Sequence, residues 1–330
     1  MAILIVGGGL VGCALALELA RRGQAVVVLE RAVAGAEASS AAGGILAPRV
    51  EAHGDDEARV LGLAALQMYE GWLSSLGGDV GFRRSGVLVV REASPDGDAR
   101  WIDGGALEAI APGLRAGGAW WLPDEAVLDT RLLVPVVHAA AERAGAVFRT
   151  GHGVVGLEAG GVTLDTGERL AGEVVVCAGA WTARLPGLGD LPVRPVRGQL
   201  AALGQVGATS AVVFGPAGYL VPRVDELVVG STMEEVGYTR GVSAGGLRHV
   251  LDHALGLFPG LAPAPLLRTW SSFRPGSPDG RALVGKVPTG WVASGHFRNG
   301  ILLAPLTARL LAAAMLDGGA LPPAWSPNRG

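Results

Sequence analysis

The chain begins with MAILIVGGGLVG, and this stretch constrains the fold more than any other. A short aliphatic run from Ala2 to Val6 is bounded by glycine, which is typical of a strand buried on both faces. Apolar residues then recur at helical spacing from Leu10, and a second apolar run begins at Ala25 and ends in Glu30. Strand, glycine turn, helix, strand and acid within about 30 residues match the dinucleotide-binding fingerprint.

Each part of this fingerprint has a physical task. Gly7 permits the tight turn, Gly9 lets the backbone approach a pyrophosphate, and Gly12 allows the helix to pack closely on the sheet. Glu30 is expected to accept hydrogen bonds from ribose hydroxyls, and its charge disfavours the 2′-phosphate of NADP. The fingerprint by itself leaves NAD and FAD open.

The opening run also has to be compared with a signal peptide or a membrane anchor. No Lys or Arg precedes it, glycines interrupt it, and it is shorter than the roughly 20 residues that span a bilayer. The two cysteines, Cys13 and Cys177, lie in apolar stretches and are expected to be reduced. We therefore expect a cytoplasmic protein.

Composition limits the partners. The net charge of −3 carries no basic stripe, so neither nucleic acid nor a membrane is an expected partner. His249 and His253 lie four residues apart, but HVLDH lacks the glutamate of the zinc motif HExxH, and we expect no metal site. A small molecule is the expected ligand.

The length of 330 residues predicts two domains. The buried run EVVVCAGAWT, with its strand ending at Gly179, and a strand over residues 291–294 followed by a helix from Gly300 are both expected to return to the first sheet. Strand patterns dominate residues 194–287 and favour an antiparallel sheet. The predicted fold is α/β plus α+β: a Rossmann-like domain, with a parallel sheet flanked by helices, interleaved with a substrate domain built on an antiparallel sheet. The predicted boundaries are 1–80, 131–193 and 288–330 for the first domain, and 81–130 and 194–287 for the second.

Three segments carry more detailed predictions. Residues 119–128, with a Pro-Asp turn, are expected to form an antiparallel hairpin. Residues 146–158 are expected to return to the first sheet and to present Val154 to an adenine. In the small-residue stretch that follows Glu30, the backbone at Gly43 and Gly44 can lie against a planar ring, and the alternative is a flexible loop.

Six sequence segments together resemble the glycine oxidases of thiamine (thiazole) biosynthesis, within the D-amino-acid oxidase family of FAD-dependent oxidoreductases. The resemblance covers nearly the whole chain, and its most specific parts are GHFRNGILLAP and RPGSPDG. The six segments are the N-terminal fingerprint, SSAAGGILAPRVE, GYLVPR, GSTMEEVG, SSFRPGSPDGRALVG and GHFRNGILLAPLTA.

The resemblance implies a flavoprotein that holds FAD non-covalently in its Rossmann-like domain. Such enzymes oxidise the amine of glycine, a similar small amine or a D-amino acid to an imine, which hydrolyses to the oxo acid and ammonia. Oxygen accepts the electrons and yields hydrogen peroxide, and the glyoxyl imine formed from glycine supplies thiazole synthesis. By analogy the protein is a homo-oligomer, specifically a homotetramer. Sarcosine oxidase and D-amino-acid dehydrogenase are close alternatives, and an inert dinucleotide-binding partner protein is an alternative of another class.

The resemblance also implies the site residues. Arg274 grips the substrate carboxylate, Tyr219 hydrogen-bonds to it, and Met233 and Arg298 line a small pocket in which Ile45 stands where methionine is expected. The positions expected to contact FAD are Gly7, Gly9, Leu10, Val11, Gly12, Glu30, Arg31, Ser39, Ser40, Gly43, Gly44, Ile45, Val154, Gly179, His296, Phe297, Arg298, Asn299, Gly300, Ile301 and Leu302.

The residue types suit this chemistry. The guanidinium of Arg274 offers a planar fork that binds a carboxylate at two points, and the hydroxyl of Tyr219 restricts rotation of the bound acid. The helix N-terminus after Gly300 can stabilise negative charge on the flavin. The alternative interpretations are a surface arginine before a turn for Arg274 and simple core packing for Tyr219.

Overall fold

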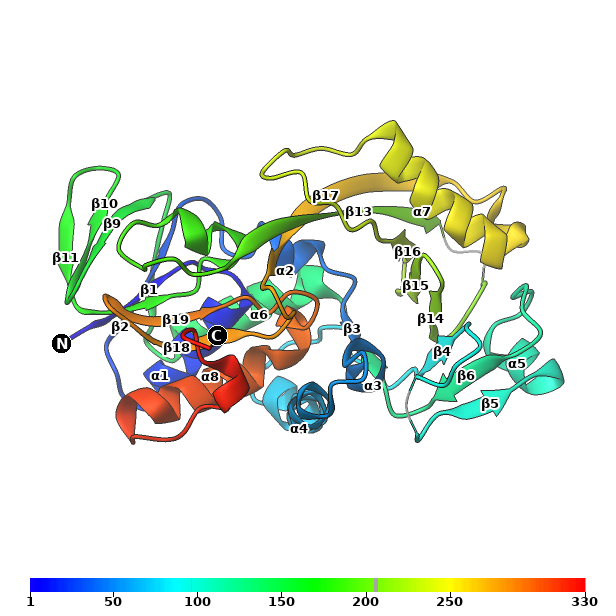
Figure 1. Ribbon diagram of the computed structural model, residues 1–330, viewed down its shortest axis with the longest axis horizontal. Helices are drawn as coiled ribbons and strands as arrows, with labels where there is room; N and C mark the ends of the chain where they lie inside the picture. Colours follow the sequence, from blue (N-terminus) through cyan, green and yellow to red (C-terminus); the bar gives the residue numbers. More distant parts are fainter. Residues whose placement is uncertain (96, 205–206, 330) are drawn as a thin grey trace.

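The computed structural model describes residues 1–95, 97–204 and 207–329. Within these residues two large sheets, one of six strands and one of eight, lie toward opposite ends of an elongated molecule (Figure 1). A sheet of three strands and a sheet of two strands complete the strand pairing of the described residues. The predicted combination of a parallel sheet with helices and an antiparallel sheet is confirmed.

The six-stranded sheet contains the fingerprint. Its central strand β1 pairs in parallel with β2 and β12, β12 pairs in parallel with β19, and β2 pairs in parallel with β8. The last strand, β18, runs antiparallel to β19 at one edge. The carboxyl ends of the five parallel strands therefore meet at one edge of this sheet. In spatial order the strands are β18 (Leu283–Val287), β19 (Gly290–Ser294), β12 (Glu173–Val176), β1 (Ile3–Val6), β2 (Val26–Glu30) and β8 (Val147–Thr150).

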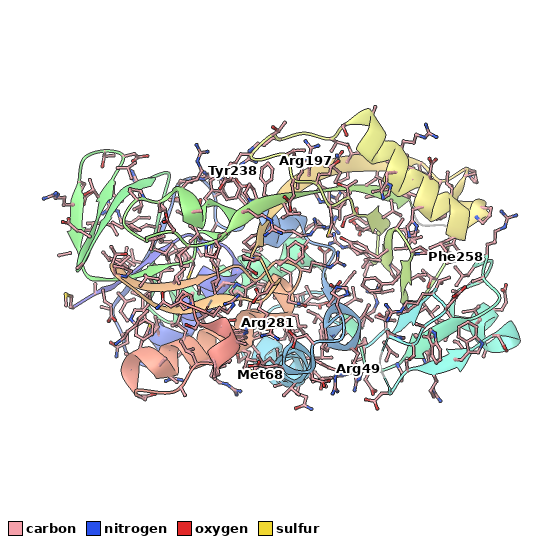
Figure 2. The ribbon with its side chains drawn as sticks, in the orientation of Figure 1. Arg49, Met68, Arg197, Tyr238, Phe258 and Arg281 are labelled. Carbon is pink, nitrogen blue, oxygen red and sulfur yellow. The ribbon has the colours of Figure 1, made fainter. Side chains whose placement is uncertain are left out.

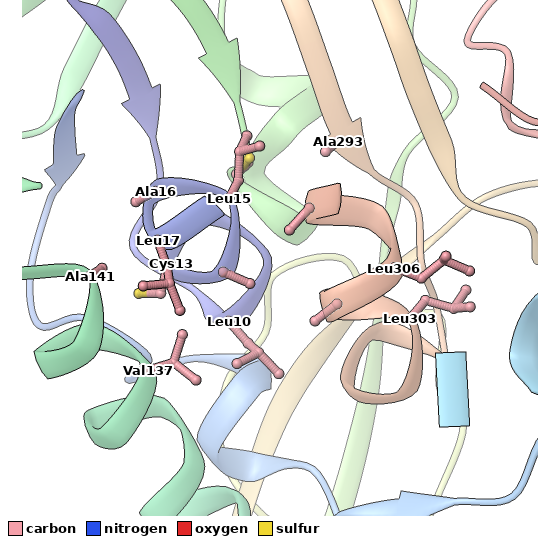
Figure 3. Close-up of a cluster of buried hydrophobic side chains, with 14 of the residues drawn as sticks. Leu10, Cys13, Leu15, Ala16, Leu17, Val137, Ala141, Ala293, Leu303 and Leu306 are labelled. Carbon is pink, nitrogen blue, oxygen red and sulfur yellow. The ribbon is translucent and has the colours of Figure 1, made fainter. Parts of the chain in front are cut away.

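The fingerprint helix α1 (Leu10–Arg21) is buried between two other helices, α6 (Thr130–Arg143) and α8 (Gly300–Leu316), as Figure 3 shows. Leu10 and Leu17 of α1 belong to the same buried cluster as Val137 of α6 and Leu303 of α8. The apolar spacing that predicted α1 is thus used on more than one side of the helix. The helix α4 (Asp56–Ser74) packs against α8.

The eight-stranded sheet is antiparallel except where β14 and β4 run in parallel. The helix α7 (Ala244–Leu257), drawn in yellow in Figure 1, packs against β13, β15 and β16. Two eleven-residue strands, β13 and β17, pair over nearly their whole length and extend toward the six-stranded sheet (Figure 1). In spatial order the strands are β17 (Leu266–Gly276), β13 (Arg194–Gly204), β16 (Glu226–Gly230), β15 (Gly218–Pro222), β14 (Val212–Gly215), β4 (Val87–Val89), β6 (Ala119–Leu122) and β5 (Arg100–Ile102).

Short elements connect these layers. They are the helices α2 (Ala38–Ala41), α3 (Pro48–Glu51) and α5 (Gly104–Ile110), and the 3₁₀ helices η1 (Gly179–Arg184), η2 (Pro259–Leu261) and η3 (Pro323–Trp325). No helix in the described ranges is both long and apolar enough to cross a membrane.

The predicted hairpin at residues 119–128 is wrong. The strand β6 pairs with β4 and β5, whereas β7 (Ala126–Val127) pairs with β3 (Ile45–Leu46) in a separate sheet. The Pro-Asp turn favours a local reversal, but long-range pairing decides the partners of both strands. Arg83 also exchanges backbone hydrogen bonds with Val127, which fixes β7 away from β6.

Only part of residues 146–158 returns to the first sheet. The strand β8 joins it beside β2, but β9 (Val154–Glu158) forms a three-stranded antiparallel sheet with β10 (Gly161–Leu164) and β11 (Arg169–Ala171). Tight turns at Gly160 and Gly167, both with positive φ, make this pairing local. The predicted domain boundaries stay a prediction; we note that β18, of the six-stranded sheet, lies inside the segment 194–287.

The packing of α1 generates a stability prediction. A methyl group at Gly12 would lie 2.1 Å from the carbonyl oxygen of Gly7 and 3.4 Å from Cβ of Cys177. We expect Gly12→Ala to lower the free energy of unfolding by about 2 kcal/mol or more, because a well-packed contact must move apart. The measurement is urea denaturation.

The matched control is Gly71→Ala in α4, where an added methyl group meets no atom within 4 Å. There the better helix propensity of alanine should raise the free energy of unfolding by up to about 1 kcal/mol. Equal stability of the two variants would contradict the close approach at Gly12.

Candidate functional site

A cavity of about 420 Å³ is lined by residues from both large sheets. Its walls include the carboxyl ends of β1, β2 and β12, the N-termini of α1 and α8, and residues of β13, β15 and β17. Ligands of open α/β sheets bind outside the carboxyl ends of the strands, which is where this cavity lies.

The glycine turn before α1 forms one end of the cavity. Gly7 has a φ of 111°, which favours glycine, and Gly9 precedes the first residue of the helix. The backbone N–H of Leu10 donates to Oγ of Ser39 at 2.9 Å, and the first turn holds no acidic residue. The positive end of the helix dipole therefore faces the cavity and is suited to an anionic group.

Glu30 ends β2 beside this turn. One carboxylate oxygen accepts from the N–H of Gly8 at 2.9 Å, and the other accepts from the N–H of Ala32 at 3.0 Å. The carboxylate is therefore fixed at the cavity wall by backbone donors, at the position that the fingerprint predicts. Its role toward ribose stays a prediction.

Arg31 and Trp181 form the wall next to Glu30. The guanidinium carbon of Arg31 lies 4.2 Å from the ring centroid of Trp181, and Arg31 also pairs with Glu37 at 2.8 Å. Tyr238, labelled in Figure 2, reaches this region from the segment between β16 and α7, and its hydroxyl donates to the carbonyl of Ala180 at 2.6 Å. The two sheets are thus connected across this side of the cavity.

A buried charge cluster holds the glycine loop that forms another wall. Nη2 of Arg223 donates to the carbonyl oxygens of Ala42 at 3.2 Å and Gly43 at 3.4 Å. The guanidinium also pairs with Glu226 at 3.1 Å and Asp129 at 3.3 Å, and only 4% of Arg223 is exposed. Because the buried charges are paired, the cluster can fix the loop backbone without leaving an isolated charge in the interior.

The segment before α8 forms the opposite wall. His296 is buried, and its Nε2 lies 3.1 Å from Oγ1 of Thr307. Burial lowers the pKa of His296 to about 4, so the imidazole is neutral at pH 7. Phe297 follows with a φ of 47°, an uncommon backbone conformation for a non-glycine residue.

Arg274, near the end of β17, is a buried cation of the cavity that is held by uncharged groups. Its Nη2 donates to Oγ of Ser231 at 2.5 Å and its Nη1 to the carbonyl of Thr232 at 3.2 Å. Within the described residues no carboxylate oxygen lies within 4.0 Å of this guanidinium, and burial lowers its pKa. A Cβ at Gly198 would lie 2.3 Å from Nη1, so glycine leaves the room that the guanidinium occupies. This arrangement suits an anionic ligand.

Tyr219 of β15 lies against the glycine loop. Its ring makes an edge contact with Phe214 at 5.9 Å between centroids, and a Cβ at Gly43 would lie 3.4 Å from its hydroxyl oxygen. Burial lowers the pKa of Arg274, and the nearby phenol of Tyr219 opposes this effect in part by raising it. Tyr219 and Arg274 therefore share one end of the cavity.

Arg298 differs from Arg274 because it has a carboxylate partner. Its Nε and Nη2 donate to the two carboxylate oxygens of Glu51 at 2.5 and 2.7 Å. Burial alone would raise the pKa of Glu51, but the charge and hydrogen bonds of Arg298 outweigh it and hold the pKa at about 2. The Sδ atom of Met233 lies 3.7 Å from Nη1 of Arg298, yet Met233 is 57% exposed and lies outside the residues that line the cavity.

The structure brings most of the predicted site residues to this cavity. Ser40, Asn299, Leu302 and Met233 do not line it, and Gly12 packs beneath the turn instead. The predicted residues that line it are Gly7, Gly9, Leu10, Val11, Glu30, Arg31, Ser39, Gly43, Gly44, Ile45, Val154, Gly179, Tyr219, Arg274, His296, Phe297, Arg298, Gly300 and Ile301.

Sequence reasoning missed Glu51, Trp181 and the partners of Arg274. Glu51 ends the quoted segment SSAAGGILAPRVE, and Trp181 lies in EVVVCAGAWT, so both stood inside segments already singled out. Glu51 contacts Arg298 and Trp181 contacts Arg31. Both partners are far away in the chain, so no local sequence pattern predicts these contacts.

The fold and the cavity are those of a dinucleotide-binding protein of the Rossmann-like class. The family described as DAO, FAD dependent oxidoreductase, matches residues 2–314. The chain therefore belongs to this family of FAD-dependent oxidoreductases.

Several curated relatives are similar over most of the chain. The bifunctional protein ThiO/ThiG of Synechocystis sp. is 36% identical over 99% of this chain and 54% of its own length, and that of Nostoc sp. is 34% identical over 96% and 52%. The chain thus spans about half the length of these two relatives. The glycine oxidase of Geobacillus kaustophilus is 32% identical over 94% of this chain and 91% of its own length.

Solved structures agree with this family. The crystal structure of glycine oxidase from Geobacillus kaustophilus matches with a TM-score of 0.91 and 30% identity, covering 99% of this chain and 98% of that one. The iminodiacetate oxidase of Chelativorans sp. BNC1 matches with a TM-score of 0.89 and 29% identity, covering 98% of each chain.

The residues present fit FAD. The glycine turn and the N-terminus of α1 offer backbone donors for a pyrophosphate, and Glu30 stands at the end of the second strand, as an adenosine ribose requires. The backbone of Gly43 forms part of the cavity wall without a side chain in the way. The cavity continues from these groups to Arg274 and so has room for a substrate beside the cofactor.

His296 generates a prediction about pH. The folded protein resists protonation of His296 down to pH about 4, whereas the unfolded chain binds that proton near pH 6.5. The neutral, buried imidazole therefore contributes fully to stability above pH 6.5. As the pH falls from 6.5 to 4, this contribution to the free energy of unfolding decreases by about 3 kcal/mol. Urea denaturation of the wild type and of His296→Gln at several pH values measures the difference.

The control is His249→Gln, which removes an exposed histidine of α7. Its pH profile should parallel that of the wild type. A constant difference between the wild type and His296→Gln from pH 7 to pH 4 would contradict the assignment.

Proposed function

We propose that this protein oxidises glycine, or a similarly small amino acid, to an imine that hydrolyses to the oxo acid and ammonia, with hydrogen peroxide as the second product. The observation that carries the proposal is the buried guanidinium of Arg274, which faces the cavity without a carboxylate partner among the described residues. We further propose that the imine formed from glycine supplies thiazole synthesis.

Arg274 and Tyr219 orient the substrate. The guanidinium binds the carboxylate, and the phenol hydroxyl donates a second hydrogen bond that restricts rotation of the bound acid. Fixing the acid in this way holds its α-carbon in one place, and orientation of this kind can supply several kcal/mol of a reduction in barrier.

The small size of the substrate follows from the surrounding side chains. Ile45, Tyr219 and the paired Arg298 line the same cavity as Arg274, and we propose that these side chains limit the size of the bound acid. Glu51 is occupied by Arg298, so it is not free to take a proton from the substrate amine. We propose that the amine loses its proton to solvent before oxidation.

The cofactor-binding residues are proposed from their positions. The turn at Gly7 and Gly9, Ser39 and Glu30 hold the dinucleotide part, and the segment from His296 to Ile301 lies along the flavin part. When bound, FAD accepts the electrons removed from the amine and passes them to oxygen. We propose that binding is non-covalent; burial raises the pKa of Cys13 and Cys177 to about 12, which disfavours attachment through either thiol.

Location, assembly and domain limits are also proposals. We propose a cytoplasmic homotetramer whose FAD-binding part comprises 1–80, 131–193 and 288–330, and whose substrate part comprises 81–130 and 194–287. Sedimentation analysis of the purified protein tests the oligomeric state.

The proposed reaction is tested with a substrate panel. The purified protein should be yellow and should release FAD on denaturation. The panel contains glycine, sarcosine, D-alanine, D-proline and the L-forms of the last two, and the protein should form peroxide with glycine. Reduction of a dye without peroxide would indicate a dehydrogenase, and a stronger response to sarcosine would indicate a sarcosine oxidase. No response to any member of the panel would overturn the proposal and favour an inert dinucleotide-binding protein.

Removal of the carboxylate anchor gives a sharper test. Arg274→Ala should raise KM for glycine about 100-fold, because a hydrogen-bonded charge pair of roughly 3 kcal/mol is lost, while FAD content stays unchanged. Steady-state kinetics and the flavin absorbance of the purified variant measure the two quantities.

The matched variant Arg274→Lys retains the charge but loses the two-point fork, and its KM should lie between those of the wild type and Arg274→Ala. An unchanged KM in both variants would show that another group binds the carboxylate.

A further inference from the structure

Two arginines lie at the substrate end of the cavity, and only one of them has a carboxylate partner. Arg298 is paired at two points with Glu51, whereas Arg274 is held by a hydroxyl and a carbonyl. Consecutive residues, Thr232 and Met233, contact one arginine each, so the two guanidinium groups are neighbours. Burial is the main cause of the lowered pKa of Arg274, and the charge of Arg298 lowers it further.

The ion pair of Glu51 and Arg298 sets the net charge at the substrate end of the cavity. Arg274 and Arg298 bring two positive charges and Glu51 brings one negative charge, which leaves one net positive charge among these three side chains. The largely exposed imidazole of His53 lies 3.6 Å from the carboxylate of Glu51. Because the carboxylate of Glu51 occupies Nε and Nη2 of Arg298, the two-point face of that guanidinium is already filled. A substrate with one carboxylate is satisfied by Arg274 alone.

Glu51 also stands at a boundary in space. Glu51, Phe297 and Arg298 line both the main cavity and a second cavity of about 380 Å³. The ion pair therefore forms part of the partition between the two. Removal of the charge of Glu51 would leave the guanidinium of Arg298, which lines both cavities, without a carboxylate partner among the described residues.

We propose that Glu51 is a specificity-determining residue, which restricts the enzyme to amines with one carboxylate by neutralising Arg298. The residue acts through Arg298 and so positions charge without itself contacting the substrate. Without this carboxylate, Arg298 is free to bind the second carboxylate of a dicarboxylic amine. The inference rests on the proposed function, because it assumes that Arg274 binds the first carboxylate.

The test uses two carboxylates that cannot be oxidised, acetate and malonate, with the FAD-loaded protein. Their dissociation constants are measured by the change in flavin absorbance on titration, which requires no turnover. The wild type should bind acetate more tightly than malonate. In Glu51→Gln the ratio of the malonate to the acetate dissociation constant should fall about tenfold or more, as a new charge-assisted hydrogen bond predicts.

A double variant distinguishes binding by the unpaired guanidinium of Arg298 from a simple increase in the size of the cavity. Glu51→Gln combined with Arg298→Gln leaves no charge at the pair, and its ratio should return to the wild-type value. The matched control is Glu168→Gln, which breaks another two-point glutamate–arginine pair, with Arg149 at 2.6 and 3.0 Å, outside both cavities. Its ratio should not change, and Glu51→Asp, which retains the charge, should remain close to the wild type.

Oxidation rates with glycine and iminodiacetate provide a second readout. The ratio of kcat/KM for iminodiacetate to that for glycine should rise about tenfold or more in Glu51→Gln and return in the double variant. An unchanged ratio in Glu51→Gln, or a gain that persists in the double variant, would overturn the inference.

Two further outcomes keep the test decisive. If Glu51→Gln does not fold, the wild type and Glu51→Asp still test the inference, and tighter binding of malonate than of acetate by either would overturn it. If the wild type oxidises no glycine, the proposed function fails on its own. Glycine oxidation with an unchanged carboxylate preference in Glu51→Gln defeats only the role of Glu51.

Discussion

The buried guanidinium of Arg274 is the constraint on which the candidate site depends. A charge removed from water is costly unless it is paired and hydrogen-bonded. Here Ser231 and Thr232 supply hydrogen bonds but no negative charge, and the backbone of Gly198 leaves room for the planar group. A substrate carboxylate completes this environment, so the interaction that orients the substrate is also one that compensates the burial of the arginine.

This arrangement requires the two large sheets to meet in a fixed way. The long strands β13 and β17 carry Arg274 from the eight-stranded sheet toward the carboxyl edge of the six-stranded sheet (Figure 1). The loop at Ala42 and Gly43 belongs to the first part of the chain but is held by Arg223, which follows β15. Trp270 of β17 adds a further bond, from its ring N–H to the carbonyl of Ala41 at 2.9 Å. The loop wall of the cavity is therefore held by side chains of the eight-stranded sheet and the segment that follows β15, which favours a preorganised site.

Sequence reasoning succeeded where the determining contacts are local. The turn at Gly7, the helix α1 and the strand β2 lie within about 30 residues and follow from apolar periodicity and glycine conformation. The segments around Tyr219 and Arg274 were found through family resemblance, and the structure places both at the cavity. The hairpin at residues 119–128 failed because the partners of both strands lie elsewhere in the chain, beyond what turn chemistry can indicate.

The sequence by itself determined the dinucleotide-binding half of the protein, because its turn, helix and acid are neighbours along the chain and their conformations depend on nearby residues. The tertiary structure alone decided which cations are free. Arg274 and Arg298 are equivalent by residue type, but Arg298 meets Glu51 across 247 residues, and Arg274 meets no carboxylate within the described ranges. The physical reason is that the net charge of a buried guanidinium and its environment depends on which groups fold against it, and such long-range contacts leave no periodic signal in the sequence.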